Sequence, residues 1–294
     1  MSSITPPTAT QGWTNLFMSK DFASTYKLAE QLTGAFGGPL IDQSGIALDQ
    51  LKEPPTVFDN ACGTGIISSC LNSKLSDQIR QKWKLTCGDF SEGMVGYTKQ
   101  RAIDEGWRNA EVKLVDAQDT QLPNDHFTHI FASFAFASFP DSKTAMKECF
   151  RILQPEGTLA ATTWKEVPWI TMLETTIKSL SPDLSFPNPT EYHDIFNKGW
   201  NNESIVQARL EEVGFKDVKT TTVTAQILLP IAVLVQLTSS VLPALLGRFW
   251  TDEQREEYEG RIPATMRELL EEMYGVDGSV PLEPVGIVVR GRKL

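Results

Sequence analysis

The sequence predicts an α/β fold built on a doubly wound, mostly parallel sheet of seven strands. Short apolar runs alternate with helical patterns throughout residues 54–165, and such alternation implies parallel βαβ units. A glycine-rich turn follows the first run and acidic residues follow the next two, which places polar groups at the carboxyl ends of the strands. Two further strand-like runs towards the C-terminus bring the number of strands to seven. With 294 residues and 41% hydrophobic side chains, the chain can bury such a core.

Residues 1–53 are expected to form an N-terminal helical cap. Apolar side chains recur at steps of three and four residues from Trp13 to Leu32, which is the period of an amphipathic helix. Several glycines then interrupt the pattern. A second helix is predicted over residues 39–52, because two prolines follow it.

Residues 54–165 are expected to form the α/β core. The strands are predicted within PTVFDNACGTG, WKLTCGDFS, AEVKLVDAQ, HFTHIFASFAF and TLAATTW. The helices between them are predicted in IISSCLNSKL, GMVGYTKQRAIDEG and DSKTAMKECFRILQPEG. This part alone supplies five of the seven strands.

Residues 166–294 are expected to complete the same single domain, adding strands to the sheet and helices that cover it. A strand is predicted in GFKDVKTTTVTAQIL, and VGIVVRGRKL is predicted to be the final one. Residues 220–247 carry no charge and are long enough to cross a bilayer. Because Pro230 and Pro243 interrupt this segment and no basic cluster flanks it, we predict a buried strand and a lid helix, not a membrane span.

Composition excludes several classes of protein. The chain has 27 Lys and Arg against 37 Asp and Glu, and its net charge of −10 argues against a nucleic-acid partner. Four cysteines in irregular spacing fit neither a disulfide scaffold nor a zinc cluster, so we expect no metal site. The N-terminus lacks the pattern of a secretory signal, and the cysteine usage suits a reducing compartment, so we expect a cytoplasmic protein.

The strongest local signal is the turn Asp59-Asn60-Ala61-Cys62-Gly63-Thr64-Gly65 after the first strand. Glycines let backbone approach a ligand closely, but Ser68 occupies the place of the third residue in the dinucleotide fingerprint. The Gly-Lys-Ser/Thr ending of a phosphate-binding loop is also missing. By itself the turn therefore indicates only a nucleoside-like ligand.

Acidic residues at the next two strand ends narrow the class of ligand further. Asp89 is placed to bind both hydroxyls of a ribose, and Asp116 with Ala117 to meet an exocyclic adenine amine. Phe90 and Met94 follow Asp89 and are placed to pack on the adenine. An acidic rim suits a cationic ligand that carries adenosine without phosphate.

In order and spacing, VFDNACGTG, CGDFSEGM, VDAQDTQLPNDHFTHIFASFAF and RILQPEGTLAATTW resemble the motifs of class I S-adenosylmethionine-dependent methyltransferases. The resemblance covers about residues 55–165 and is greatest to small-molecule methyltransferases of fungal secondary metabolism. It implies a Rossmann-like sheet and S-adenosyl-L-methionine as the cofactor. The positions that it assigns to the methionine end are Asp59, Ala61, Gly63 and Gly65. It also places Asp89 at the ribose, Phe90 and Met94 at the adenine, Asp116 and Ala117 at the adenine edge, and Ser133 or Phe134 behind the sulfonium.

Some of these positions have plainer interpretations. Asp116 is also a possible helix N-cap, and Met94 a possible core residue. Cys62 lies inside the turn, but no neighbouring histidine activates it, so a structural role is favoured over a nucleophilic one. Ala61 stands where the family commonly has glycine.

The residues outside the core are expected to build the site for the methyl acceptor. His193 lies in NPTEYHDIF and is the candidate general base, with a solvated loop histidine as the alternative. Trp13, Trp164, Trp169 and Tyr192 are candidate acceptor-binding residues, whereas helix-core roles are favoured for Phe22 and Tyr26.

The sequence thus predicts an enzyme, monomeric or homodimeric, that methylates an O, N or S atom of a small apolar or aromatic metabolite. A non-methylating rearrangement or cyclisation on the same cofactor is one alternative. A non-catalytic protein that binds an adenosyl ligand is the other.

Overall fold

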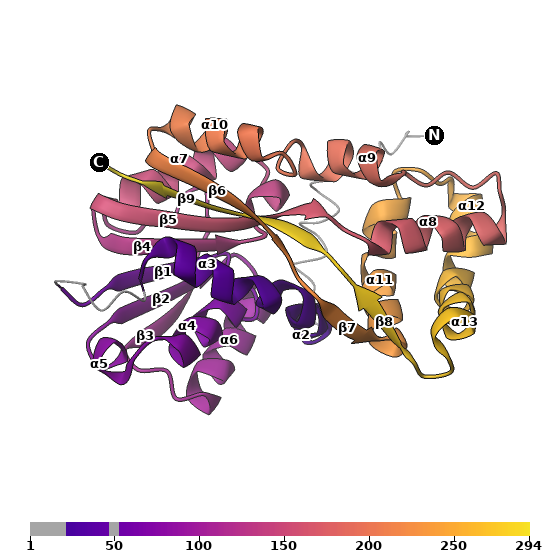
Figure 1. The fold of residues 1–294 in the computed structure, drawn as a ribbon, viewed down its shortest axis with the longest axis horizontal. Coiled ribbons are helices and arrows are strands. Elements are labelled where there is room, and N and C mark those ends of the chain that lie inside the picture. Colours follow the sequence, from indigo (N-terminus) through magenta and orange to yellow (C-terminus); the bar gives the residue numbers. More distant parts are fainter. Residues whose placement is uncertain (1–21, 47–52) are drawn as a thin grey trace, which may run out of the picture.

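The computed structural model of the protein describes residues 22–46 and 53–294 (Figure 1). A seven-stranded sheet has the order β3-β2-β1-β4-β5-β9-β6, and β9 alone runs opposite to the other six strands. The strands are β1 (Thr56–Asn60), β2 (Lys84–Asp89), β3 (Ala110–Leu114), β4 (Phe127–Ser133), β5 (Leu153–Glu166), β6 (Lys216–Thr224) and β9 (Val285–Arg292). The predicted doubly wound, mostly parallel sheet is confirmed.

The strand order places a crevice at the carboxyl ends of β1 and β4. From β1 the chain proceeds to β2 and β3 on one side and then returns to β4 and β5 on the other. Connections that leave in opposite directions open a space between the two strands, where ligands bind in open α/β sheets. The pairing Asp59↔Cys87 sets the register that brings the polar ends of β1 and β2 to the same edge.

Helices cover both faces of the sheet and bury its apolar side chains. On one face, α3 (Gly37–Ser44) and α4 (Ile66–Lys74) share a core with β1 and β2, and α6 (Glu92–Asp104) packs on β2 and β3. On the other, α7 (Ser142–Ile152) and α10 (Glu203–Val213) share a core with β4 and β5. A short helix, α5 (Asp77–Arg80), precedes β2.

A helical layer with its own apolar core lies beyond one end of the sheet, at the right in Figure 1. It contains α8 (Trp169–Leu180), α11 (Ile231–Leu246), α12 (Asp252–Tyr258), α13 (Ile262–Tyr274) and the two-stranded sheet β7 (Ile227–Pro230) and β8 (Ser279–Leu282). Helix α2 (Phe22–Thr33) contacts α11 and α6 and so joins this layer to the core. In the described part of the chain, no helix is long and apolar enough to cross a membrane.

Three local predictions differ from the structure. The segment around His193, for which a solvated loop was the alternative, contains α9 (Pro189–Tyr192) and a π-helical turn, His193–Asn197, because Asn188 and Glu191 form a capping box around Pro189. The strand predicted in GFKDVKTTTVTAQIL is divided into β6 and β7, which belong to different sheets. The helix predicted over 39–52 ends at Ser44, where Gly45 adopts the left-handed conformation, and residues 47–52 lie outside the described residues.

Candidate active site

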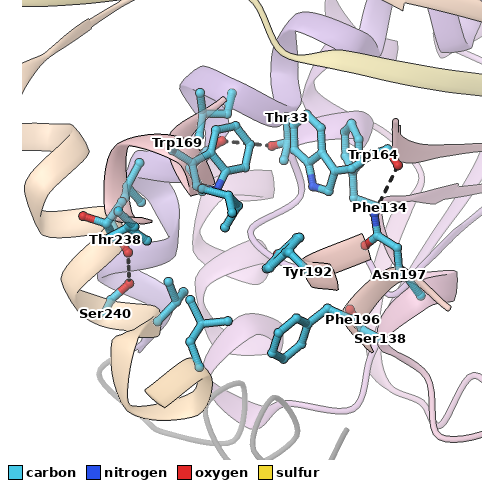
Figure 2. Close-up of a pocket in the computed structure, with 18 of the residues that line it drawn as sticks. Thr33, Phe134, Ser138, Trp164, Trp169, Tyr192, Phe196, Asn197, Thr238 and Ser240 are labelled. Carbon is cyan, nitrogen blue, oxygen red and sulfur yellow. Dashed lines mark hydrogen bonds between the residues drawn. The ribbon is translucent and has the colours of Figure 1, made fainter. Parts of the chain in front are cut away.

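Two adjoining cavities lie at the carboxyl edge of the sheet. The first, which we call the strand-end cavity, has a volume of about 220 Å³. The second, the apolar cavity, has a volume of about 180 Å³ and lies between the sheet and the helical layer (Figure 2). Tyr26, Phe134 and Ser138 line both, so these three residues form the boundary across which the cavities meet.

Nine of the eleven residues predicted for the cofactor line the strand-end cavity. They are Ala61, Gly63, Asp89, Phe90, Met94, Asp116, Ala117, Ser133 and Phe134. They come from the ends of four strands, so the fold gathers at one edge what the sequence spreads over more than seventy residues. Asp59 and Gly65 do not line the cavity.

The carboxylate of Asp89 braces the glycine turn. Its Oδ2 accepts a hydrogen bond from the Gly63 amide at 2.9 Å, and its Oδ1 accepts one from the Ser91 amide at 3.0 Å. Burial raises the pKa of Asp89, and the backbone hydrogen bonds oppose that rise. Each carboxylate oxygen can accept more than one hydrogen bond, so Asp89 keeps acceptor capacity for a ligand.

Asp59 and Gly65 are residues of the turn that face the protein interior and not the cavity. The Asp59 Oδ2 accepts hydrogen bonds from the Ser68 hydroxyl at 2.6 Å and from the Ser68 amide at 3.1 Å. Burial raises the pKa of Asp59 to about 7. Ser68, which departs from the dinucleotide fingerprint, is therefore the residue that ties Asp59 to the start of α4.

The turn also carries backbone strain at a position where glycine is common. Ala61 has a φ of 53°, in the left-handed region that costs L-residues about 1–2 kcal/mol. This geometry explains why glycine suits the position. Phe134, at the boundary of the two cavities, shares the feature with a φ of 54°.

Asp116 and Met94 also line the strand-end cavity. The Asp116 side chain accepts a hydrogen bond from the Gln118 amide at 2.8 Å, and its backbone forms an isolated β-bridge with Asp119. Asp116 therefore stabilises a turn and not the start of a helix. Met94 is buried in the first turn of α6, yet it also lines the cavity, so its core role and its site role coincide.

The chemistry of this cavity fits a cationic nucleoside. Its described lining includes two carboxylates, Asp89 and Asp116, and no Lys, Arg or His. A phosphate group would lack a counter-charge there, whereas a sulfonium ligand with an adenosine would meet acidic and aromatic groups.

The apolar cavity contains three of the four residues predicted to bind the acceptor: Trp164, Trp169 and Tyr192. Trp13 lies outside the described residues. The Trp164 ring stacks on Phe134 with centroids 3.9 Å apart, and Trp169 meets it edge-on at 5.2 Å. The described residues that line this cavity carry no formal charge.

His193 lies behind the wall of the apolar cavity and does not line it. Its Nδ1 is 2.7 Å from Nδ2 of Asn197, which also donates to the Trp164 carbonyl at 3.2 Å. Burial lowers the pKa of His193. The neutral ring therefore accepts at Nδ1, and Asn197, not His193, meets the cavity.

Many lining residues were not predicted from the sequence, and Tyr26 and Asn197 are among them. Tyr26 was assigned to a helix core, but it lines both cavities, and a Cβ at Gly63 would lie 3.4 Å from its ring. Asn197 had no motif around it, and only its spacing of four residues from His193 could have suggested it. Cys62 is buried and its pKa is well above the usual value, which agrees with a structural role.

Comparison with known proteins agrees with this geometry. Residues 57–157 match a protein family described as "Methyltransferase domain". The fold resembles that of YcgJ from Bacillus subtilis (TM-score 0.51, 15% identity, 87% of this chain and 97% of that one). It also resembles a phosphoethanolamine N-methyltransferase 2 from Haemonchus contortus, solved with S-adenosylhomocysteine (TM-score 0.56, 12% identity, 98% of this chain and 60% of that one).

Fold and site together define an S-adenosyl-L-methionine-dependent methyltransferase of the Rossmann-like class. Over 278 residues the chain is 47% identical to "Methyltransferase tpcH" of Aspergillus fumigatus, covering 95% of this chain and 98% of the relative. It is 45% identical to the "Acetylaranotin bis-thiomethyltransferase" of Aspergillus terreus, covering 97% and 99%. The chain belongs to the family of methyltransferases of fungal secondary metabolism, and it is an enzyme that transfers a methyl group from S-adenosyl-L-methionine to a small metabolite.

Proposed function

We propose that the apolar cavity binds the methyl acceptor and that the acceptor is a small apolar or aromatic metabolite. One observation carries this proposal: an uncharged, aromatic-lined cavity meets the strand-end cavity across Tyr26, Phe134 and Ser138. Bound S-adenosylmethionine supplies an electrophilic methyl group on a sulfonium. The chain's own task is then to align the acceptor with that methyl group and to exclude water.

In this proposal the strand-end residues hold the cofactor as the sequence predicted. Asp89 receives the ribose hydroxyls, Asp116 receives the adenine amine, and Phe90 and Met94 pack on the adenine. Ala61 and Gly63 approach the methionine end through backbone, with Ser133 and Phe134 behind the sulfonium. Asp59 and Gly65 act indirectly, because they shape the turn from behind.

The acceptor atom must react without a strong base from the apolar cavity. Of the described residues that line it, only Tyr26 and Tyr192 titrate, and burial raises the pKa of both, that of Tyr26 to about 12. Both are protonated at neutral pH. A thiol, an acidic hydroxyl or a neutral amine meets this requirement. The similarity to a bis-thiomethyltransferase favours the thiol among them.

We also propose a division of labour along the chain. Residues 54–165 bind the cofactor and also supply part of the acceptor site, including Phe134, Ser138 and Trp164. The other described walls of that site come from α2 and from residues 166–294, with α11 as its lid. The enzyme acts in the cytoplasm as a monomer or homodimer and does not take nucleic acid as a substrate, in keeping with its net charge of −10. Light scattering and a fluorescent fusion test the oligomeric state and the location.

Methyl-labelled cofactor tests the reaction on a panel of matched aromatic thiols, phenols and amines. We expect label in the product, with the thiol turned over fastest. Product without label would instead support a rearrangement or cyclisation. Cofactor binding without any turnover would support a non-catalytic protein.

The ribose assignment has a separate test in the variant Asp89→Asn. This change removes one charged acceptor, so we expect cofactor binding to weaken by about 10- to 100-fold. Asp104→Asn is the matched control, because it removes an exposed carboxylate of α6 that does not line either cavity. Equal affinity of Asp89→Asn and the control would refute the assignment.

A further inference from the structure

We infer that Asn197 is a specificity-determining residue that receives a neutral hydrogen-bond donor, O–H or N–H, of the methyl acceptor, and that His193 is the residue that positions it. This inference rests on the proposed function of the apolar cavity. It assigns the acceptor a second polar group besides the atom that is methylated.

The hydrogen bonds of Asn197 fix which of its atoms is available. Its Nδ2 donates to His193 Nδ1 at 2.7 Å and to the Trp164 carbonyl at 3.2 Å, which uses both amide hydrogens. Within the described part of the chain, no group donates to its Oδ1. Figure 2 shows this oxygen on the cavity side of the side chain.

The other polar side chains that line the cavity differ from this oxygen, because they carry hydroxyls or indole N–H groups: Tyr26, Thr33, Ser138, Thr163, Trp164, Trp169, Tyr192, Thr238 and Ser240. The hydroxyls of Thr33, Thr238 and Ser240 donate to carbonyls of their own helices, at 3.2, 2.9 and 2.7 Å. A hydroxyl can also rotate to donate or to accept, whereas an amide oxygen only accepts. Among the described residues that line the cavity, Asn197 therefore presents the one side-chain acceptor that cannot also donate, and a ligand that leaves it unpaired forfeits a hydrogen bond.

The chemistry of an amide oxygen defines the group that it receives. It is not basic enough to remove a proton, and it repels an anion. The donor that it binds is thus a neutral O–H or N–H and is distinct from an acceptor atom that reacts as an anion. Asn197 contacts Trp164, which stacks on Phe134 at the boundary of the cavities, so the donor is held close to the site of transfer.

His193 holds Asn197 in this orientation. A neutral imidazole that accepts at Nδ1 requires an N–H from Asn197, which turns Oδ1 towards the cavity. Both residues lie in the π-helical turn His193–Asn197, four positions apart. Such turns are frequent at functional sites.

The test measures binding, not methyl transfer. The probes are 2-naphthol, which has one O–H and is neutral at pH 7, and 2-methoxynaphthalene, which has none. Equilibrium dialysis in the presence of S-adenosylhomocysteine gives the dissociation constant of each. We expect the wild type to prefer 2-naphthol by about 10-fold, and Asn197→Leu to lose that preference while Thr238→Val retains it.

The positioning role of His193 has its own readout. His193→Ala should reduce the preference, and His193→Asn should restore it, since the Asn oxygen can take the place of Nδ1. His129→Gln controls for the loss of a buried histidine elsewhere.

The outcomes separate this inference from the function on which it rests. A wild-type ratio near one, or an unchanged ratio in Asn197→Leu, overturns the role of Asn197 and leaves the acceptor cavity standing. Failure of His193→Asn to restore the ratio overturns the role of His193. If neither probe binds to the wild type, both the inference and the assignment of the cavity to the acceptor are overturned.

Discussion

Gly63 and Gly65 lie two residues apart in the same turn, and alanine at each is expected to fail for a different reason. Both have positive φ, 55° and 79°, so alanine costs about 1–2 kcal/mol at either position. A Cβ at Gly65 would also lie 2.9 Å from Thr98 Cγ2, closer than real Cβ contacts, and 3.0 Å from the Trp107 ring, which is a tight contact. At Gly63 the nearest atom is a Tyr26 ring carbon at 3.4 Å, an ordinary contact.

We therefore expect Gly65→Ala to lower the free energy of unfolding by about 2–4 kcal/mol, because overpacking adds about 1–3 kcal/mol to the backbone cost. Gly63→Ala should cost only about 1–2 kcal/mol. Urea unfolding followed by circular dichroism measures both values. Cofactor affinity should show the opposite order, since Gly63 lines the strand-end cavity and Gly65 does not.

Gly63→Ala should weaken S-adenosylmethionine binding by about 10-fold. The two measurements together test the geometry of the turn. If Gly65→Ala is no less stable than Gly63→Ala, the contacts with Thr98 and Trp107 do not have the effect that we assign to them. If Gly63→Ala binds the cofactor normally, the turn does not approach the ligand at that residue.

Three further predictions concern single side chains. Ala61→Gly should raise the free energy of unfolding by up to about 1 kcal/mol, because it relieves the strain at φ 53°; a decrease in urea unfolding would contradict this. Burial lowers the pKa of His129 to about 4 from 6.5, so the unfolded chain binds the proton first as pH falls. Lowering pH from 7.5 to 5 should thus cost the wild type about 2 kcal/mol more than His129→Gln, and equal losses would rule this out. Trp164→Ala should weaken binding of an aromatic acceptor by about 10-fold or more, while cofactor affinity falls less. The reason is that Phe134 loses its stacking partner but its backbone amide still donates to Thr162. A larger effect on cofactor binding than on acceptor binding would contradict this.

The parts of the site that sequence predicts well are those in which chemistry follows a strand end directly. Asp89 and Asp116 each close a strand of the parallel sheet, and parallel strands bring such ends to one edge. Pattern alone therefore places them together. The direction in which a side chain points depends on packing with other segments. The sequence therefore did not reveal that Asp59 points away from the cavity and accepts hydrogen bonds from Ser68.

Features that depend on contacts between distant parts of the chain could not be predicted from the sequence. Tyr26 reaches the glycine turn only because α2 packs between α6 and α11, and no periodicity in α2 reveals those neighbours. Asn197 faces the cavity because a π-helical turn changes the register of the segment after α9. The small sheet of β7 and β8 joins segments about fifty residues apart. The alternation of apolar and polar residues in each strand is too short to predict that the two strands pair.

β9 follows the other six strands of the sheet in the sequence, yet it does not lie at the edge of the sheet. β9 lies between β5 and β6 and pairs with both, so its neighbours stay separated until residues 285–292 have left the ribosome. Until β9 has been made, β5 has no partner on its β9 side and exposes an unpaired edge. A chain that stops before β9 should hence yield aggregates and not a smaller working enzyme.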